Sequence, residues 1–274
     1  MIFRRRRERP KGQSINMLIP NILTVLALCA GMTAIRFGIA GRLEWAVFSL
    51  LVAAIFDALD GRIARLLGGT SKFGAELDSL SDFVSFGVAP AVMLYFWTMR
   101  DAGGVGWALT LLFSVCCALR LARFNTRVGE TDLPPWAFNY FTGVPAPAGA
   151  ALVLVPMMLS FEFGTGVFDL PAVNGAVIVA VAFLEVSRIP TYSFKRFRVP
   201  HKYVLPTLVV AGLFAASLAS APWATVVAGM MAYVISIAFS VRSFRHLQRE
   251  AQRIQAEGGT VVRAANESQN RAAS

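Results

Sequence analysis

Long apolar runs, each close to twenty residues and divided by short polar connections, constrain the fold of this chain more than any other feature. A helix needs about 20 apolar residues to cross a bilayer, where only helices and closed barrels satisfy their own backbone hydrogen bonds. The sequence therefore predicts an all-α fold, a polytopic transmembrane helical bundle. The eight expected spans cover about residues 17–40, 43–67, 73–98, 105–125, 144–161, 170–188, 202–219 and 222–242.

Charged residues are scarce, and they gather at the ends of the apolar runs. They make up 15% of the chain, against about 25% in a typical soluble domain, while hydrophobic residues make up 56%. Much of the formal net charge of +10 falls in 4–11, in 188–202 and in the tail after Arg242. Basic groups that flank apolar helices set membrane topology and attract anionic lipid, so we expect no nucleic-acid partner.

The basic residues also predict which side of the membrane each connection occupies. With eight spans both termini share a side, and that side carries most of the lysines and arginines. The positive-inside rule then places both termini in the cytoplasm. We expect three parts: a basic cytoplasmic N-terminal segment at 1–16, a transmembrane domain at 17–242, and a basic, partly disordered cytoplasmic tail at 243–274.

Four aspartates lie where the second and third runs meet. Asp57 and Asp60 are three residues apart, and Asp78 and Asp82 are four apart, so each pair shares one helix face. A short connection makes the two helices antiparallel neighbours, and all four carboxylates can converge. A charge at the centre of a membrane costs on the order of 2.5–3.5 kcal/mol, which bound cations offset. Such oxygen ligands suit two divalent cations, Mg²⁺ or Mn²⁺.

Small and polar residues beside the aspartates indicate what such a site would hold. Gly61 and Ala64 leave a bare strip on the second helix, and Gly74 does the same on the third, so that a flat or charged group can approach the backbone. Taken singly, a small residue in a membrane helix is usually a packing residue. Basic and hydroxyl groups in the connection suit phosphate oxygens. These groups are Arg65, Ser71 and Lys72.

The spacing of these residues resembles the signature of the CDP-alcohol phosphotransferase family, D-x2-D-G-x2-A-R-x8-G-x3-D-x3-D. Its fixed positions are filled by Asp57, Asp60, Gly61, Ala64, Arg65, Gly74, Asp78 and Asp82. The resemblance implies that one metal ion is bound by Asp57, Asp60 and Asp78. It implies that the second ion is bound by Asp57, Asp78 and Asp82, with Asp82 as the proton acceptor.

The same resemblance extends to the CDP-linked substrate. It implies that Gly61, Arg65 and Ser71 contact that substrate. Asn21 and Thr24 resemble the family's first-helix element beside the nucleotide, although polar residues at a helix end can also be caps. We expect the CDP-lipid site to comprise these five residues. It also includes Ala64, Lys72 and Gly74.

Two further tracts, 118–125 and 141–148, resemble the membrane-type phosphatidylserine synthases of bacteria and archaea. Arg120 and Arg123 are three residues apart at one helix end and can hold an anionic group, or they can anchor the helix among lipid headgroups. With Asn125 they are the candidate acceptor- or phosphate-binding residues. The resemblance implies CDP-diacylglycerol and L-serine as substrates and a homodimer. It also implies the cytoplasmic membrane of a prokaryote, with the active site facing the cytoplasm.

Two alternatives remain open at this point. The first keeps the chemistry and changes the acceptor to glycerol 3-phosphate, an inositol phosphate or choline, because only the two tracts favour serine. The second is a divalent-cation transporter, since carboxylates within a membrane also line ion paths. A transporter predicts polar residues through the depth of the bilayer, whereas here they gather at one end of the apolar runs.

Overall fold

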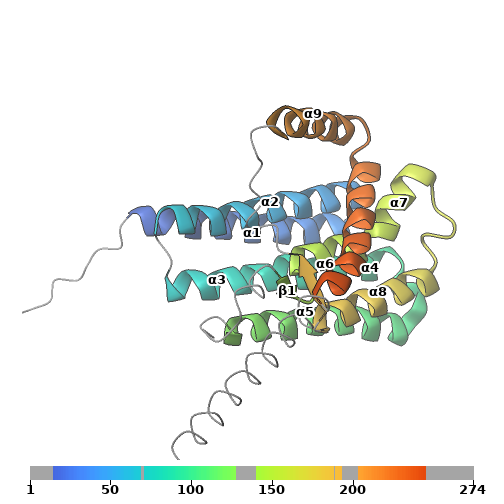
Figure 1. Cartoon of the computed structure of the whole chain (residues 1–274). Helices are drawn as coiled ribbons and strands as arrows, with labels where there is room; N and C mark the ends of the chain where they lie inside the picture. The colour runs from blue at the N-terminus through green and yellow to red at the C-terminus, as the bar shows by residue number, and fades with distance from the viewer. Residues whose placement is uncertain (1–14, 69–70, 128–139, 188, 193–202, 245–274) are drawn as a thin grey trace, which may run out of the picture. The chain divides into compact units, whose positions relative to one another are not determined.

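The computed structural model describes residues 15–68, 71–127, 140–187, 189–192 and 203–244 (Figure 1). Each of the eight predicted runs forms helix in these ranges, with ends within a few residues of those predicted. The predicted segments 1–16 and 243–274 lie almost wholly outside the described residues. The helices are α1 Ile15–Ile39, α2 Leu43–Leu66, α3 Lys72–Asp82, α4 Ala89–Trp97, α5 Gly103–Arg127, α6 Ala146–Val153, α7 Val155–Phe163, α8 Pro171–Val186, α9 Val204–Ser220 and the last described helix, Pro222–Phe244.

Two of the predicted runs contain more than one helical segment. The third run is one continuous helix, Lys72–Trp97, in which the π-helical segment η1 (Phe83–Val88) joins α3 to α4. The fifth run is α6 followed by α7, with a 40° bend between them. Pro156 lies in the first turn of α7, where its missing amide hydrogen costs no helical hydrogen bond, so the helix restarts there.

Length and apolarity separate these helices as candidate membrane spans. Within the described residues four helices are long and apolar enough to cross a membrane, or five if the bent α6–α7 pair is one span. The four are Leu18–Ile39, Lys72–Trp97, Met99–Thr126 and Pro222–Phe244. Helices α8 and α9 are apolar but shorter, at 16 and 17 residues. The structure therefore has several apolar helices of the kind that integral membrane proteins use.

Helix α1 packs on α2 and runs beside α3, η1 and α4. Small residues allow this close approach, as is common between membrane helices. A Cβ added at Gly31 would lie 2.8 Å from the Cα of Ser85, and one added at Gly38 would lie 2.8 Å from the Cγ of Met93. Side chains larger than hydrogen at these two positions would therefore separate α1 from its neighbour.

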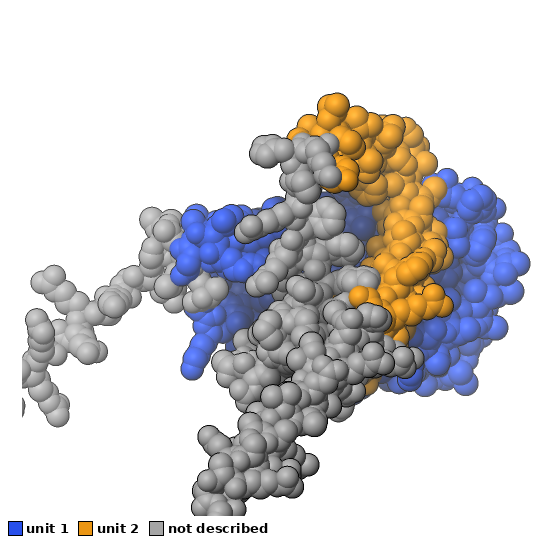
Figure 2. Space-filling model, in the orientation of Figure 1, with its two compact units in different colours: residues 1–125, 146–183 blue, residues 126–145, 184–274 orange. Residues whose placement is uncertain are grey.

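The chain divides into two compact units, which Figure 2 colours separately. Unit 1 comprises residues 1–125 and 146–183, and unit 2 comprises 126–145 and 184–274. Within unit 2, β1 (Tyr140–Thr142) pairs antiparallel with β2 (Pro190–Tyr192). This small sheet is an addition to the predicted all-α architecture, because three-residue strands are too short to show an alternating pattern in the sequence.

Candidate active site

The connection between α2 and α3 brings the acidic parts of the two helices together. Helix α2 ends at Leu66, and Gly68 follows in the left-handed conformation that favours glycine, with φ of 62°. Helix α3 then begins at Lys72, where the hydroxyl of the N-cap residue Ser71 accepts a hydrogen bond of 3.0 Å from the Gly74 amide. The chain thus reverses within a few residues, and α1 packs on both helices.

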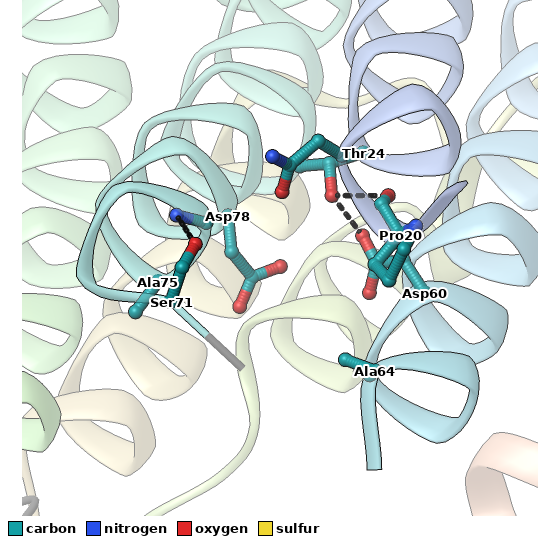
Figure 3. Close-up of a pocket in the computed structure, with 10 residues that line it drawn as sticks. Pro20, Thr24, Asp60, Ala64, Ser71, Ala75 and Asp78 are labelled. Atoms are coloured by element: carbon teal, nitrogen blue, oxygen red, sulfur yellow. Dashed lines mark hydrogen bonds between the residues drawn. The ribbon is translucent and has the colours of Figure 1, made fainter. Parts of the chain in front are cut away.

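Three of the four aspartates form a compact carboxylate cluster. Oxygen atoms of Asp57, Asp60 and Asp78 lie within 4.8 Å of one another. Asp60 is only 4% exposed, and its Oδ2 accepts a hydrogen bond of 2.5 Å from the hydroxyl of Thr24 in α1. Figure 3 shows Asp60 and Asp78 reaching from α2 and α3 into the same space. The structure thus brings together the residues that the family resemblance assigns to one metal ion.

Asp82 lies one helical turn after Asp78 and is not part of this cluster. Its carboxyl group is half-buried and within hydrogen-bonding reach of Asp57. Two carboxyl groups in such contact need a proton or a cation between them, since two bare carboxylates repel. The guanidinium of Arg120, on α5, is close enough to interact electrostatically with both Asp57 and Asp82. The acids therefore adjoin a basic group on a third helix.

The carboxylate cluster fits a small divalent cation. Carboxylate oxygens are the ligands that Mg²⁺ and Mn²⁺ prefer. An ion with bonds of about 2.1 Å holds its ligand oxygens no more than about 4.2 Å apart. The cluster oxygens are within 4.8 Å, so side-chain movements of a few tenths of an ångström would close them onto one ion. Asp57, Asp60 and Asp78 can therefore hold a metal ion.

A cavity of about 190 Å³ opens beside the cluster, between α1, α2 and α3 (Figure 3). Two basic residues predicted for the CDP-lipid site, Arg65 and Lys72, are exposed and do not line it. The predicted residues that do line it come from all three helices. They are Asn21, Thr24, Asp60, Gly61, Ala64, Ser71, Gly74 and Asp78.

Two glycines shape the cavity in different ways. A Cβ added at Gly61 would meet no atom within 4 Å, so the backbone of α2 is open to the cavity there. A Cβ added at Gly74 would lie 2.9 Å from Oδ1 of Asn21 and 3.1 Å from Oγ of Ser71. Gly74 therefore lets Asn21 lie against the first turn of α3, whereas Gly61 leaves space for a bound group.

The predicted acceptor residues lie near the end of α5. The Asn125 amide nitrogen donates a hydrogen bond of 2.9 Å to the hydroxyl of Ser79, which follows Asp78 directly. Arg120 and Arg123 are half-buried; Arg120 lies more than one turn before Asn125, and Arg123 about half a turn before it. Asn125 thus ties the end of α5 to the acidic part of α3, and Arg120 of the same helix interacts electrostatically with Asp57 and Asp82.

Comparison with protein-family models shows the family to which the chain belongs. A family model described as "CDP-alcohol phosphatidyltransferase" matches residues 17–186, which is more than half of the chain. The chain belongs to the CDP-alcohol phosphatidyltransferase family. A second model of the same kind, "CDP-alcohol phosphatidyltransferase 2", matches residues 202–237. Membership of this family favours a transferase over a cation transporter.

Curated relatives narrow the similarity within the CDP-alcohol phosphatidyltransferases. A Mycobacterium leprae protein is 38% identical over 87% of this chain and 80% of its own length. A Helicobacter pylori protein is 35% identical over 72% of the chain and 81% of its length, and one from Methanocaldococcus jannaschii is 36% identical over 65% and 77%. All three are named CDP-diacylglycerol–serine O-phosphatidyltransferase.

Some residues of this candidate site could not be found from the sequence. Pro20 and Ala75 line the cavity, and neither has a side chain that signals a binding role. Ser79 and Ser81 lie between the two aspartates of α3, at variable positions of the signature. The hydroxyl of Ser81 donates to the carbonyl of Thr24 at 3.1 Å. Only the i, i+3 spacing of Ser81 to Asp78 hinted that it shares the acidic side of the helix.

Proposed function

We propose that this chain transfers a phosphatidyl group from CDP-diacylglycerol to L-serine, giving phosphatidylserine and CMP. The observation that carries the proposal is the carboxylate cluster of Asp57, Asp60 and Asp78 beside an open cavity, in a chain that belongs to the CDP-alcohol phosphatidyltransferases. The choice of serine is supported by the names of relatives that share 35–38% identity with it.

The cavity between α1, α2 and α3 is proposed to hold the CDP part of the substrate. Gly61 leaves its helix backbone open, and Asn21 and Thr24 offer polar groups from α1. The hydrogen bond from Thr24 fixes Asp60 in one orientation, as partners of metal-binding carboxylates commonly do. Two divalent cations, Mg²⁺ or Mn²⁺, would neutralise the pyrophosphate and the charge that develops on the departing CMP.

The acceptor is proposed to bind on the other side of the carboxylates. The guanidinium of Arg120 would hold the serine carboxylate, with Arg123 and Asn125 on the same helix end. Asp82 accepts the proton of the serine hydroxyl, and that oxygen forms a bond to the lipid-side phosphorus. The bond from this phosphorus to the bridging pyrophosphate oxygen breaks, and CMP leaves. No described side chain is placed as a covalent nucleophile, so we infer a direct displacement.

The proposal includes a topology. Eight spans with both termini in the cytoplasm place the α2–α3 connection, and with it the site, on the cytoplasmic side of a prokaryotic cell membrane. The apolar helices and the basic sequence of the connections support this arrangement. Acyl chains would then extend between helices into the lipid. Residues 17–242 form the catalytic domain in this proposal, and the homodimer stays a prediction.

The acceptor is tested by measuring CMP release from CDP-diacylglycerol by the purified full chain. Serine, glycerol 3-phosphate, an inositol phosphate and choline are supplied singly, each with and without Mg²⁺. We expect release that requires both Mg²⁺ and serine. Faster release with another alcohol would overturn the serine assignment and leave the family intact, whereas no metal-dependent release with any alcohol would overturn the transferase itself.

The role of Asp82 is tested by Asp82→Asn. Loss of a general base typically costs about 10²–10⁴-fold in rate, so we expect kcat to fall by about that factor. Binding of CDP-diacylglycerol should persist, because Asp82 does not line the cavity. Turnover is measured as CMP release and binding by equilibrium titration. Turnover near that of the unsubstituted chain would overturn the assignment of Asp82 as the base.

A further inference from the structure

The helix that carries Asp78 and Asp82 changes its winding immediately after Asp82. Residues Phe83–Val88 form the π-helical segment η1, in which the Ala89 amide bonds to the carbonyl of Val84, five residues earlier. Such segments make up well under 1% of protein structure and are frequent at functional sites. Because the turn holds one more residue than an α-helical turn, everything after it is rotated by about 100° relative to a regular helix.

This rotation keeps one face of the helix on α1. The Ser81 hydroxyl donates to the carbonyl of Thr24 at 3.1 Å, and that of Ser85 to the carbonyl of Ala27 at 3.4 Å. Met93 also faces α1, where it contacts the position of Gly38. In a regular helix, the eight-residue step from Ser85 to Met93 would point the Met93 side chain about 80° away from the direction of Ser85 around the helix axis.

With one residue absorbed by the π turn, the angle between Ser85 and Met93 falls to about 20°. In a regular helix, Ser81 and Met93 could not both face α1. If Met93 kept its contact with α1, then Ser81 and the adjacent Asp82 would be rotated away from their present directions. The winding of η1 thus connects the direction of Asp82 to the packing of the apolar part of the helix.

Neighbouring helices hold η1 from two further sides. The Ser114 hydroxyl of α5 donates a hydrogen bond of 3.1 Å to the carbonyl of Gly87. Its hydrogen bond to the Thr110 carbonyl within α5 is longer, at 3.4 Å. A Cβ added at Gly87 would lie 3.2 Å from the Sγ of Cys117, so α5 and η1 are in close contact. Helix α6 also packs on η1. Ser85, Phe86 and Gly87 are buried among these helices.

We infer that η1 sets the rotation of Asp82 toward Asp57 and the acceptor, and that Ser114 is a positioning residue acting through it. This inference rests on the proposed function, in which Asp82 moves the proton. Ser114 touches no reacting group. It holds the π turn from α5, and Gly31 gives Ser85 the room to hold it from α1.

The test compares Ser114→Ala with Ser49→Ala. Both remove one serine hydroxyl from a helix, but among the described residues Ser49 bonds within its own helix, to the carbonyl of Trp45. We expect Ser114→Ala to lower kcat about tenfold, since misplacing a reacting group by about 1 Å can cost 10²-fold. The KM for CDP-diacylglycerol should stay within twofold, because Asp82 does not line the cavity.

Two more variants separate positioning from general stability. Ser114→Thr keeps the hydroxyl and should retain at least half of the kcat. Gly31→Ala forces a Cβ against Ser85 and should lower kcat like Ser114→Ala. Melting temperatures of Ser114→Ala and Ser49→Ala should agree within a few degrees.

The inference is overturned if Ser114→Ala lowers kcat no more than Ser49→Ala, or raises the KM for CDP-diacylglycerol while kcat is unchanged. The acceptor assay on the unsubstituted chain reports separately on the proposed function. A chain that used another alcohol would be tested with the same variants and that acceptor.

Discussion

Two cavities of unit 1 are opposite in character. The one beside Asp60 and Asp78 has a volume of about 190 Å³, and the other, between α5 and α8, has about 690 Å³. The larger cavity is lined by apolar and small side chains such as Val105, Leu109 and Val179. Size alone would select the larger cavity, whereas the proposed site lies in the smaller one. The proposal rests on the carboxyl groups of α2 and α3 that gather beside the smaller cavity.

The largest expected effect comes from removing one carboxylate of the cluster beside the small cavity. Asp78→Asn removes a carboxylate from the cluster, and we expect activity to fall on the order of 10²–10³-fold, as when one charge-stabilising group is lost. CMP release measures the activity, and Mn²⁺ titration followed by electron paramagnetic resonance measures metal binding. Asp101→Asn, an exposed acid in another segment, is the control and should stay fully active. Normal metal binding by Asp78→Asn would contradict the assignment of the carboxylate cluster as the metal site.

The next effect concerns space in the small cavity. Gly61→Val fills an opening where no atom lies within 4 Å, and we expect the KM for CDP-diacylglycerol to rise about tenfold. A tenfold rise corresponds to about 1.4 kcal/mol, at the lower end of the 1–3 kcal/mol that overfilling a packed site typically costs. Gly104→Val is the matched control, because Gly104 is also a helical glycine with open space around it. Equal KM values in the two variants would show that the cavity does not bind this substrate.

A smaller effect is expected from the hydrogen bond that orients Asp60. Thr24→Val keeps the shape of the side chain and removes the hydroxyl, so the Mg²⁺ concentration for half-maximal activity should rise about tenfold. Thr33→Val serves as the control, since in the part of the chain that the structure describes the Thr33 hydroxyl donates to the Cys29 carbonyl of the same helix. Equal Mg²⁺ requirements of Thr24→Val and Thr33→Val would contradict the role of Thr24 in orienting Asp60.

The smallest effect should come from the large cavity. Ala176→Leu adds apolar volume to its exposed lining, and both kcat and KM should stay within twofold, because substitutions away from a site usually change stability by no more than about 0.5 kcal/mol. A CMP-release assay at several CDP-diacylglycerol concentrations gives both constants. A tenfold change in the KM for CDP-diacylglycerol would show that the larger cavity also takes part in lipid binding. The two cavities would then no longer differ in function.

Periodicity and length could predict most of the fold. The apolar runs gave the helices within a few residues, because a membrane helix must be long and apolar. The π turn after Asp82 was not predictable, since it depends on the fit of Ser85 and Met93 against α1 rather than on a local preference. The bend between α6 and α7 had a signal in Pro156, but a proline in a membrane helix does not always produce a bend.

The site was predictable where the sequence has rigid spacing. The signature gave Asp57, Asp60 and Asp78, whose oxygens the structure brings together. The contact between Asn125 and Ser79 was not foreseen in this form, because it joins helices 46 residues apart in sequence. Such contacts depend on how α5 packs against α3, which a single sequence does not report.

The pairing of β1 with β2 has a consequence for exchanging parts between relatives. The two connections that contain these strands are joined further: the Gly143 amide donates to the Ile189 carbonyl at 2.8 Å, and the Thr191 hydroxyl donates to the Gly143 carbonyl at 2.9 Å. Gly143 has φ of 79°, and a Cβ there would lie 2.8 Å from the carbonyl oxygen of Glu185. A chimaera must therefore inherit both connections from one parent, because neither is a separable module.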